Sequence, residues 1–439
     1  MNSNFEPNNR NRMKIKLLLI ISCFCFALTA NSQKRKCAPI NDMSVYLSNP
    51  ENLKAHQANE AFIKKWVNDK KNNRIKKEVI TIPVVVHVVY RTEAQNISDA
   101  QIKSQIAVLN EDFRKLNSDI SVAPAAFSEV SADIEINFAL ANRDPDGNTT
   151  TGITRRMTTT VDIGKALTGA DSNVKNTNTG GTDSWDVSKY LNIWIAEAGK
   201  EGGSDILGYA SPPQASSTLQ ALADQDGVVI ISTAFGNTGT VQSPFNLGRT
   251  ATHEVGHYLN LIHIWGDGDC NVDDEVVDTP PQGASTSGCP VFPVTSGGTH
   301  CAAAPNGPMF VNYMDYSNDA CLVMFTQGQK TRMLAALAGP RIGLKTSNGL
   351  SVKDFSADFN LSIYPNPSKD NINLTYNNLL ARNGGDVLIY DITGKEVLQE
   401  KINKNQFSKS INVSKLTNGI YFLKINSDNK NLVKKIIIE

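Results

Sequence analysis

The sequence predicts an α/β (α+β) domain with a mixed sheet, a backing helix and a second helix that carries paired histidines, followed by a small all-β sandwich. The first domain is predicted because one strand, one helix and several more strands precede the histidine-rich helix. The sandwich is predicted because short alternating segments, separated by turn residues, fill the end of the chain. With 439 residues and 40% hydrophobic content, the chain has enough apolar side chains for both cores.

Composition divides the chain into a signal peptide, a pro-segment, a catalytic domain, a linker and the sandwich. Their expected bounds are 1–30, 31–73, 74–345, 346–358 and 359–439. The formal net charge is zero, which gives no indication of nucleic-acid binding. We expect a monomer whose partners are protein or peptide substrates.

The leader combines a basic start with an apolar core. Residues 13–16 (MKIK) precede the run LLLIISCFCFALTA, which ends in small residues at Ala30. This arrangement is typical of a secretory signal peptide, and the run is shorter than a membrane-spanning helix normally needs. A membrane anchor and a lipoprotein modified at Cys23 are the alternatives. Export makes disulfides reasonable in this chain.

Residues 31–73 are rich in lysine and asparagine, show no hydrophobic alternation and are interpreted as a pro-segment. Cys37 stands alone within them. Because a thiolate is a good zinc ligand, Cys37 is a candidate for holding a zymogen latent, and an incidental cysteine is the alternative. Arg74 is the candidate start of the mature enzyme.

The first part of the catalytic domain contains clear strand and helix signals. Residues 79–90 (VITIPVVVHVVY) are largely β-branched and predict a buried strand, in which His87 is interpreted as structural. Ser98 is the expected N-cap of the next helix, with Gln101 three residues later. Further strands are predicted at 134–141, 190–196 and 227–232.

The stretch 252–265 (THEVGHYLNLIHIW) carries the strongest chemical signal. His253 and His257 are four residues apart, which on an α-helix places them about 40° apart and about 6 Å along the axis. Two imidazoles in this arrangement can bind one metal ion, with Glu254 beside them as a general base.

His263 predicts a third ligand. On a continuous helix it would lie about 15 Å along the axis from His253, too far to share one ion. The helix must therefore end and the chain must reverse near Asn260. Reversals often need a positive φ, which favours glycine and, next to it, asparagine.

Residues 266–321 are rich in glycine, proline, aspartate and cysteine, and we expect disulfides to stabilise them. The four cysteines of this segment allow three pairings. Acidic residues cluster directly after the histidines: Asp267, Asp269, Asp273, Asp274, Glu275 and Asp278. Clustered carboxylates are suited to calcium, and a solvated acidic loop is the alternative.

The sequence NYMDY at 312–316 follows this segment. Met314 is expected in a tight turn beneath the metal. Ordinary core packing of its side chain is the alternative interpretation and is compatible with this role. Tyr316 is a candidate for hydrogen bonding to an oxyanion. Residues 327–337 are expected to form a closing helix.

These motifs resemble one known family. HEVGHYLNLIH at 253–263, DTP at 278–280 and NYMDY are similar to the pappalysin branch of the metzincin metalloproteases. IPVVVHVVY and TTGITR at 150–155 also resemble the upper part of that family's domain. The sequence departs from the family pattern at Asn260, where the family has glycine.

The resemblance implies a metzincin-like fold and a set of site residues. His253, His257 and His263 would bind zinc, with Glu254 as the base, Met314 in the Met-turn and Tyr316 assisting the transition state. Calcium would lie at Asp274 and the carbonyl of Thr279, next to Asp278. Disulfides would pair Cys270 with Cys301 and Cys289 with Cys321. Asp319 would favour Arg or Lys after the scissile bond, and Cys37 would bind the zinc of the zymogen.

The end of the chain resembles the C-terminal sorting domain of the type IX secretion system. The matching segments are YPNPS at 364–368, DITGK at 391–395, LTNGIYFLKI at 416–425 and the ending KKIIIE. This resemblance implies a partner in the outer-membrane secretion machinery and a secreted or surface-attached product. An ordinary binding sandwich is the alternative.

The sequence thus predicts a secreted zinc endopeptidase that is made as a latent zymogen. Three histidines would hold zinc, which would activate a water molecule for which Glu254 acts as the base. One alternative is a zinc protease whose third ligand is a later glutamate. Another is a non-catalytic surface adhesin that retains a structural metal, although such a site needs neither Glu254 nor Tyr316.

Overall fold

The computed structural model describes residues 50–71, 78–166, 172–201, 204–213, 225–350, 361–376, 378–427 and 430–439. They belong to two compact units, residues 1–350 and residues 351–439. The predicted leader, Cys37, Arg74 and most of the predicted linker lie outside the described residues. Within the described part of the chain, no helix is both long and apolar enough to cross a membrane.

The first unit is built on a mixed sheet in the order β2-β1-β4-β8-β7, with β3 also paired to β1. The strands are β1 (Ile80–Tyr90), β2 (Ile136–Leu140), β3 (Ile153–Met157), β4 (Leu191–Ile195), β7 (Gly208–Ala210) and β8 (Val228–Ile230), and a separate hairpin joins β5 (Lys200–Glu201) and β6 (Ser204–Asp205). All pairs of this sheet are parallel except β7 with β8. The sequence predicts four strands before the histidine-rich helix, and they correspond to β1, β2, β4 and β8.

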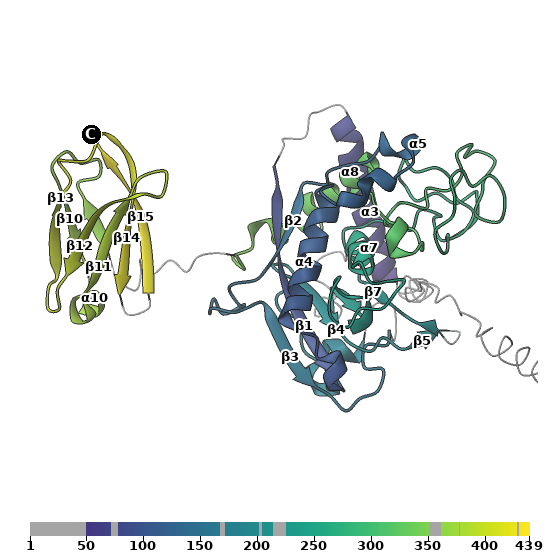
Figure 1. Ribbon diagram of the computed structural model, residues 1–439, viewed down its shortest axis with the longest axis horizontal. Coiled ribbons are helices and arrows are strands. Elements are labelled where there is room, and N and C mark those ends of the chain that lie inside the picture. The colour runs from purple at the N-terminus through teal and green to yellow at the C-terminus, as the bar shows by residue number, and fades with distance from the viewer. Residues whose placement is uncertain are drawn as a thin grey trace, which may run out of the picture. The chain divides into compact units, whose positions relative to one another are not determined.

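The helices of this unit are α3 (Pro50–Lys71), α4 (Asp99–Phe113), the short α5 (Ala125–Ser128), α7 (Arg249–Tyr258) and α8 (Gln327–Ala338). Two of them, α4 and α7, contact the strands of the sheet, and α3 contacts α8. The hydroxyl of Ser98 accepts the Gln101 N–H at the start of α4, as the sequence predicts. Figure 1 shows α4 running across the strands of the sheet, with α7 behind it, and the two helices are in contact.

The apolar residues of β1 show why it lies at the centre. Val84, Val85, Val86 and Val88 are all fully buried, because neighbouring strands and helices cover both faces of this strand. His87 is also fully buried, with hydrogen bonds to the side chains of Thr154 and Asn192 at 2.8 and 3.0 Å. Its place in the sheet agrees with the structural role expected from the sequence.

Helix α3 was not predicted, because residues 31–73 lack a clear hydrophobic period. In the structure Ile63 is fully buried and Trp66 packs against the main core. A few apolar side chains on one face are enough to hold the helix in place once the rest of the unit provides a surface for them. In Figure 1, α3 lies beside α8, which it contacts.

Residues 259–326, all of which the structure describes, contain only one short 3-10 helix, η6 (Asp319–Cys321). Two disulfides hold this segment, and they pair Cys270 with Cys301 and Cys289 with Cys321. This is the pairing that the resemblance implies. The other 3-10 helices are η1 (Glu93–Gln95), η2 (Ser118–Val122), η3 (Asn173–Lys175), η4 (Thr177–Thr179), η5 (Ser232–Ala234) and η7 (Ile342–Thr346).

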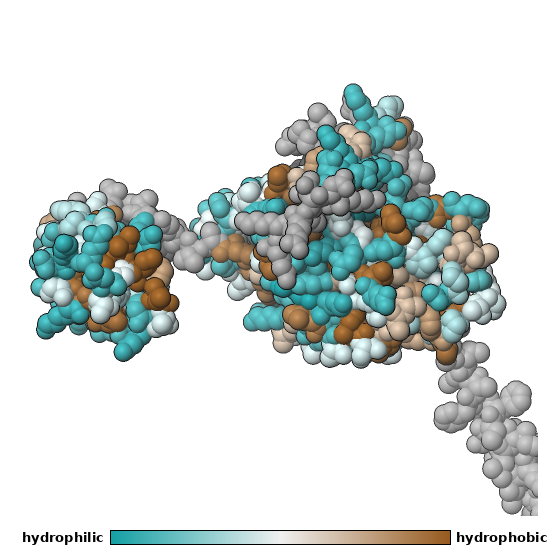
Figure 2. Space-filling view, turned by 90° about the horizontal axis from the view of Figure 1, so that it is seen from above, coloured by the Kyte–Doolittle hydropathy of each residue, from teal (hydrophilic) through white to brown (hydrophobic). Residues whose placement is uncertain are grey.

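The second unit is a sandwich of two antiparallel sheets, as predicted. One sheet has the order β13-β10-β9 and the other β12-β11-β14-β15. Its elements are β9 (Ser362–Tyr364), β10 (Asn371–Thr375), α10 (Asn378–Asn383), β11 (Gly385–Tyr390), β12 (Glu396–Ile402), β13 (Ser408–Asn412), β14 (Gly419–Ser427) and β15 (Lys430–Ile438). Figure 2 shows hydrophobic side chains gathered on the face of this unit that it displays.

Candidate metal site

The site is built on α7, which is buried along its whole length. Its first turn is fixed by the carboxylate of Asp112 on α4. Asp112 accepts hydrogen bonds from Arg249, from the Thr252 hydroxyl at 2.6 Å and from the Tyr313 hydroxyl at 2.9 Å. One buried carboxylate therefore links α4, α7 and the loop that contains Tyr313, and a buried charge of this kind is stable only with such partners.

Three histidine side chains converge at the end of α7. The Nε2 atom of His257 lies 3.1 Å from Nε2 of His253 and 3.1 Å from Nε2 of His263. In the described part of the chain, these residues are the only group of three or more His, Cys, Asp or Glu whose ligand atoms lie within 4.8 Å of one another. All three are buried.

The opposite nitrogen of each ring has an acceptor that determines the tautomer. His253 Nδ1 lies 2.7 Å from the Tyr313 carbonyl oxygen, and His257 Nδ1 lies 2.9 Å from the Leu261 carbonyl oxygen. His263 Nδ1 lies 2.5 Å from a carboxylate oxygen of Asp267. Because carbonyl and carboxylate oxygens only accept, each Nδ1 carries the proton and each Nε2 presents a lone pair.

This arrangement fits a metal ion. Lone pairs as close as the 3.1 Å between His257 and each of the other two histidines repel one another unless a cation lies between them. Tetrahedral zinc takes histidine nitrogens at about 2.0–2.1 Å. Burial, and next to it the neighbouring His263, lower the pKa of His257 to about 3. His257 therefore remains neutral at physiological pH, which is the form that binds metal.

The chain reverses at Asn260, as the sequence predicts. Asn260 has φ 75°, in the left-handed region that asparagine tolerates better than most residues. Its N–H donates to the His257 carbonyl and the Leu261 N–H donates to the Gly256 carbonyl, both at 2.9 Å. These bonds end the helix within one turn and bring His263 back to the other two histidines.

Glu254 lies next to this cluster in sequence and is fully buried. The edge strand β7 passes close to it. A Cβ atom at Gly208 would lie 3.0 Å from Glu254 Cγ and 3.2 Å from its Oε1. Glycine at position 208 therefore leaves room for the carboxylate between α7 and the edge of the sheet.

Met314 and Tyr316 lie below and beside the histidines. A Cβ at Gly256 would lie 2.5 Å from the Met314 sulfur, so Met314 packs directly against α7. The Tyr316 ring is centred 5.0 Å from the ring of His263 and 5.7 Å from that of His253. The structure thus brings both residues of the predicted turn to the cluster.

Comparisons with known proteins agree with this arrangement. The family described as "Pregnancy-associated plasma protein-A" matches residues 173–338, and the family described as "Secretion system C-terminal sorting domain" matches residues 362–439. An extracellular metalloprotease of Pyricularia oryzae is 33% identical over 276 residues, which are 61% of this chain and 78% of the relative.

The chain belongs to the pappalysin family of metalloproteases.

Two solved structures resemble this pappalysin. A mutant of Tannerella forsythia promirolysin is 43% identical, with a TM-score of 0.62, and the match covers 72% of this chain and 98% of that one. Mature mirolysin in complex with a cleaved peptide is 48% identical, with a TM-score of 0.56, and the match covers 62% and 97% of the two chains. The fold of the first unit is therefore metzincin-like, as predicted.

The sorting domain and the extracellular relatives show that this pappalysin is secreted or attached to the cell surface. The C-terminal sandwich is thus a secretion domain rather than an ordinary binding module. Its match implies an interaction with the secretion machinery. Exposed hydrophobic side chains of the sandwich include Ile420, Phe422 and Val433.

Asp319 lies at the start of η6 and is fully buried. Its Oδ2 accepts the N–H of Leu247 at 2.8 Å and the N–H of Arg249 at 3.3 Å. The carboxylate is thus held against the backbone at the N-terminus of α7, where the helix dipole favours a negative charge.

The residues of the predicted calcium site are only partly together. Asp274 is buried, and both of its oxygens accept the Thr279 hydroxyl, at 2.8 and 2.9 Å. Asp278 instead faces α8, where it accepts from the Thr326 hydroxyl at 2.7 Å and the Gly328 N–H at 2.9 Å. Both oxygens of Asp278 therefore have protein partners at the start of that helix.

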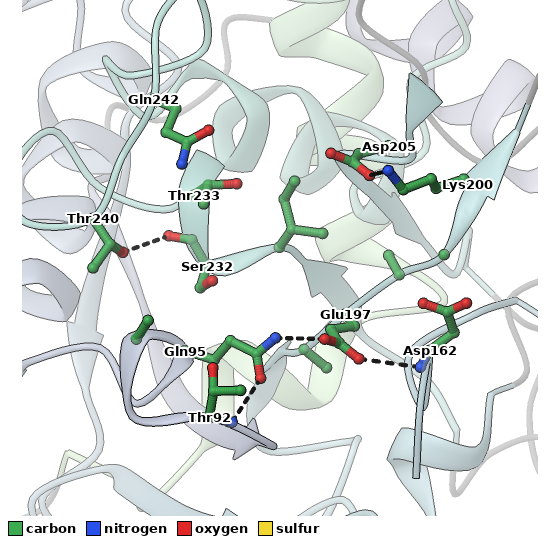
Figure 3. A pocket seen from close by; sticks show the side chains of 15 residues that line it. Thr92, Gln95, Asp162, Glu197, Lys200, Asp205, Ser232, Thr233, Thr240 and Gln242 are labelled. Carbon is green, nitrogen blue, oxygen red and sulfur yellow. Dashed lines mark hydrogen bonds and ion pairs between the residues drawn. The ribbon is translucent and has the colours of Figure 1, made fainter. Parts of the chain in front are cut away.

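A cavity of about 380 Å³ lies away from the histidines, at the carboxyl ends of β1, β4 and β8. Figure 3 shows its polar lining, in which Gln95 and the Asp162 N–H both donate to Glu197. Lys200 and Asp205 form an ion pair at 3.3 Å. Glu197 is also paired with Arg91 at 2.7 Å, so Glu197, Lys200 and Asp205 each have a charged partner.

Sequence reasoning missed three residues of the site. Asp267 was included in the acidic cluster, but it binds His263, and its position four residues later was the available signal. Trp265 stacks on His263, with ring centroids 4.2 Å apart. Asp112 is far away in sequence, and no local pattern marks it as the partner of α7.

Replacing Asp267 with alanine should weaken metal binding. The His263 ring would lose the acceptor that fixes its tautomer and orientation, and losses of this kind typically cost 10–100-fold in metal affinity, so about that change is expected. Titration with a competing chelator would measure it. The exposed Asp269 provides a control, because Asp269→Ala should leave the affinity unchanged. Equal affinities for the Asp267→Ala variant and the unmodified protein would contradict the role of this carboxylate.

Proposed function

We propose that the protein is a zinc-dependent endopeptidase in which His253, His257 and His263 hold the zinc ion. The observation that carries this proposal is the convergence of three imidazoles, whose ligand atoms lie within 4.8 Å of one another and whose Nδ1 atoms each face an acceptor. Bound zinc would supply a Lewis acid that lowers the pKa of a water molecule and polarises a carbonyl group. Family membership supports a metal-dependent protease.

The residues of the chain have separate roles in peptide hydrolysis. Glu254 takes a proton from the attacking water and returns it to the amine that leaves when the peptide bond breaks. Its burial beside Gly208 fits this role, because the packing between α7 and the edge strand restricts where the carboxylate can lie. The Tyr316 hydroxyl donates a hydrogen bond to the oxyanion of the tetrahedral intermediate.

Glu254→Gln should fold and bind zinc, yet lose proteolysis by on the order of a thousandfold, because the amide cannot accept the proton. Casein hydrolysis and the zinc content of the purified variant would measure both effects. Glu93→Gln, on the surface, is the matched control and should retain full activity. A Glu254→Gln variant that cleaves casein at the unmodified rate would exclude Glu254 as the base.

We infer that Asp319 selects Arg or Lys after the scissile bond. Its carboxylate lies beneath the residues that lead into α7, and a buried negative charge favours a cationic side chain in an adjacent pocket. The peptide in the mirolysin complex supports a peptide substrate. The same preference would permit self-cleavage before Arg74.

Digestion of a peptide library by the mature enzyme tests this preference. Most cuts should precede Arg or Lys, and Asp319→Asn should lower kcat/KM for these peptides by about tenfold or more, since it removes the charge but retains an acceptor for the backbone N–H groups. Cuts before neutral residues should change much less. An unchanged distribution of cleavage sites in Asp319→Asn would remove Asp319 from the specificity pocket.

We further infer that the enzyme is made as a zymogen. The proposed pro-segment is residues 31–73, with Cys37 as the zinc ligand that maintains latency. Support comes from the match to promirolysin, which covers more of this chain than the match to mature mirolysin, 72% against 62%. A thiolate bound in the open coordination position would exclude the water that hydrolysis needs.

The same loop is proposed to bind calcium, at Asp274 and the Thr279 carbonyl, with Asp278 close in sequence. Burial raises the pKa of Asp274 from its ordinary value of 3.8 to about 7. A buried carboxylate with so high a pKa lacks a cationic partner of sufficient charge, and calcium would provide one. Clustered carboxylate and carbonyl oxygens are the ligands that calcium prefers.

This assignment predicts a pH-dependent response to calcium. Without calcium, the folded protein binds the proton of Asp274 more tightly than the unfolded chain, so the free energy of unfolding falls as pH rises from about 4 to about 7. Calcium binds the ionised form, so it should raise Tm by on the order of 3 °C at pH 8 and much less at pH 5.

Thermal unfolding with calcium and with a calcium-selective chelator would measure this response. Asp274→Asn, which cannot ionise, should unfold at the same temperature in both conditions. Asp269→Asn serves as the surface control and should respond as the unmodified protein does. A Tm at pH 8 that is independent of calcium in the unmodified protein would refute the site.

A further inference from the structure

Helix α3 is attached to the first unit by contacts at several points along its length. Ile63 is fully buried, and the ring of Phe62 lies against Gly339, where any added Cβ would collide with it. The Asn59 amide donates to the Pro213 carbonyl at 3.1 Å. Lys64 forms an exposed ion pair with Glu275 at 3.0 Å. These contacts fix both the position and the rotation of the helix.

Glu60 makes a largely buried polar contact, with its side chain 18% exposed. Its carboxylate accepts two bonds from the Arg332 guanidinium, at 2.9 and 3.0 Å, and one from the Asn260 side-chain amide at 2.9 Å. Arg332 also donates from Nε to the Asn260 backbone carbonyl at 2.7 Å. The three residues thus form a closed ring that holds Asn260 by its side chain and by its backbone.

This ring acts on the residue that shapes the metal site. Asn260 has a positive φ, and the reversal at this position returns His263 to the other two histidines. The Arg332 side chain is only 4% exposed, and the carboxylate of Glu60 is its ion-pair partner at 2.9 Å. Both contacts to Glu60 come from the same guanidinium nitrogen, Nη2, and charge-assisted hydrogen bonds of this kind are stronger than neutral ones.

We propose that Glu60 is a positioning residue of the zymogen, which holds the Asn260 turn in its metal-binding conformation until the pro-segment is removed. The inference rests on the proposed function, since it takes Glu60 to belong to a segment cleaved before Arg74. Removal of the segment then takes away the carboxylate that Arg332 and Asn260 share. The turn is then more rigid in the zymogen than in the mature enzyme.

Amide hydrogen exchange tests this proposal on the full chain. Glu254→Gln serves as the background, so that self-cleavage cannot remove α3 during the measurement. In this background Glu60→Ala should raise exchange at residues 258–263 by about tenfold or more, because it leaves the buried guanidinium without its carboxylate. Glu60→Gln should have a smaller effect, because its amide oxygen still accepts from Asn260. Lys64→Ala removes an exposed ion pair from the same helix and should leave the turn unchanged.

A second variant keeps the test decisive if Glu60→Ala does not fold. Asn260→Gly accommodates the positive φ and removes only the side-chain bond to Glu60, so exchange within α3 should increase while the fold is retained. Equal exchange rates at residues 258–263 in Glu60→Ala and Lys64→Ala would overturn the proposal. An exchange rate within α3 that is unchanged in Asn260→Gly would overturn it as well. Neither result depends on proteolysis, so failure here leaves the assignment of Glu254 intact.

Discussion

The metal site depends on the reversal of the chain at Asn260. Without it, α7 would carry His263 away from the ion, and the first two histidines would lack their partner. The reversal is maintained by backbone bonds from Asn260 and Leu261 and by the guanidinium of Arg332 on the Asn260 carbonyl. The placement of a metal ion is therefore set by the geometry of one residue with positive φ.

Hydrogen-bond acceptors around the site fix the tautomer and the orientation of the three histidines. Each imidazole is held by an acceptor on Nδ1, two of them backbone carbonyls and one the carboxylate of Asp267. Asp112 connects α4 to α7 and, through Tyr313, to the carbonyl that orients His253. Helices α4 and α7 and the loop of Tyr313 therefore meet at one buried carboxylate, which makes the site rigid before any ligand arrives.

Local patterns were sufficient to predict much of this structure. The β-branched run of β1, the capping residues of α4 and the histidine spacing each depend on neighbours in sequence, and each prediction agrees with the structure. The turn at Asn260 was predicted because a helix cannot bring His263 to the metal without it. The alternating strands and turn residues of the tail likewise predicted a sandwich.

Features that depend on distant partners were missed. Helix α3 is weakly amphipathic and is held by α8 and by the Asn260 turn, which no local pattern reveals. The short edge strand β7 lies in a segment rich in glycine and serine, and glycine has a low strand propensity. Pairing with β8 stabilises the strand instead. Asp267 was counted only as a member of the acidic cluster, whereas the structure places its carboxylate on His263.

The central claim is that three imidazoles share one zinc ion. Anomalous diffraction from crystals of the full-length Glu254→Gln protein, recorded on both sides of the zinc absorption edge, tests it most directly. The account predicts one peak at about 2.0–2.1 Å from Nε2 of each of the three histidines. A peak elsewhere, or a peak at this position with His263 turned away from it, would contradict the account.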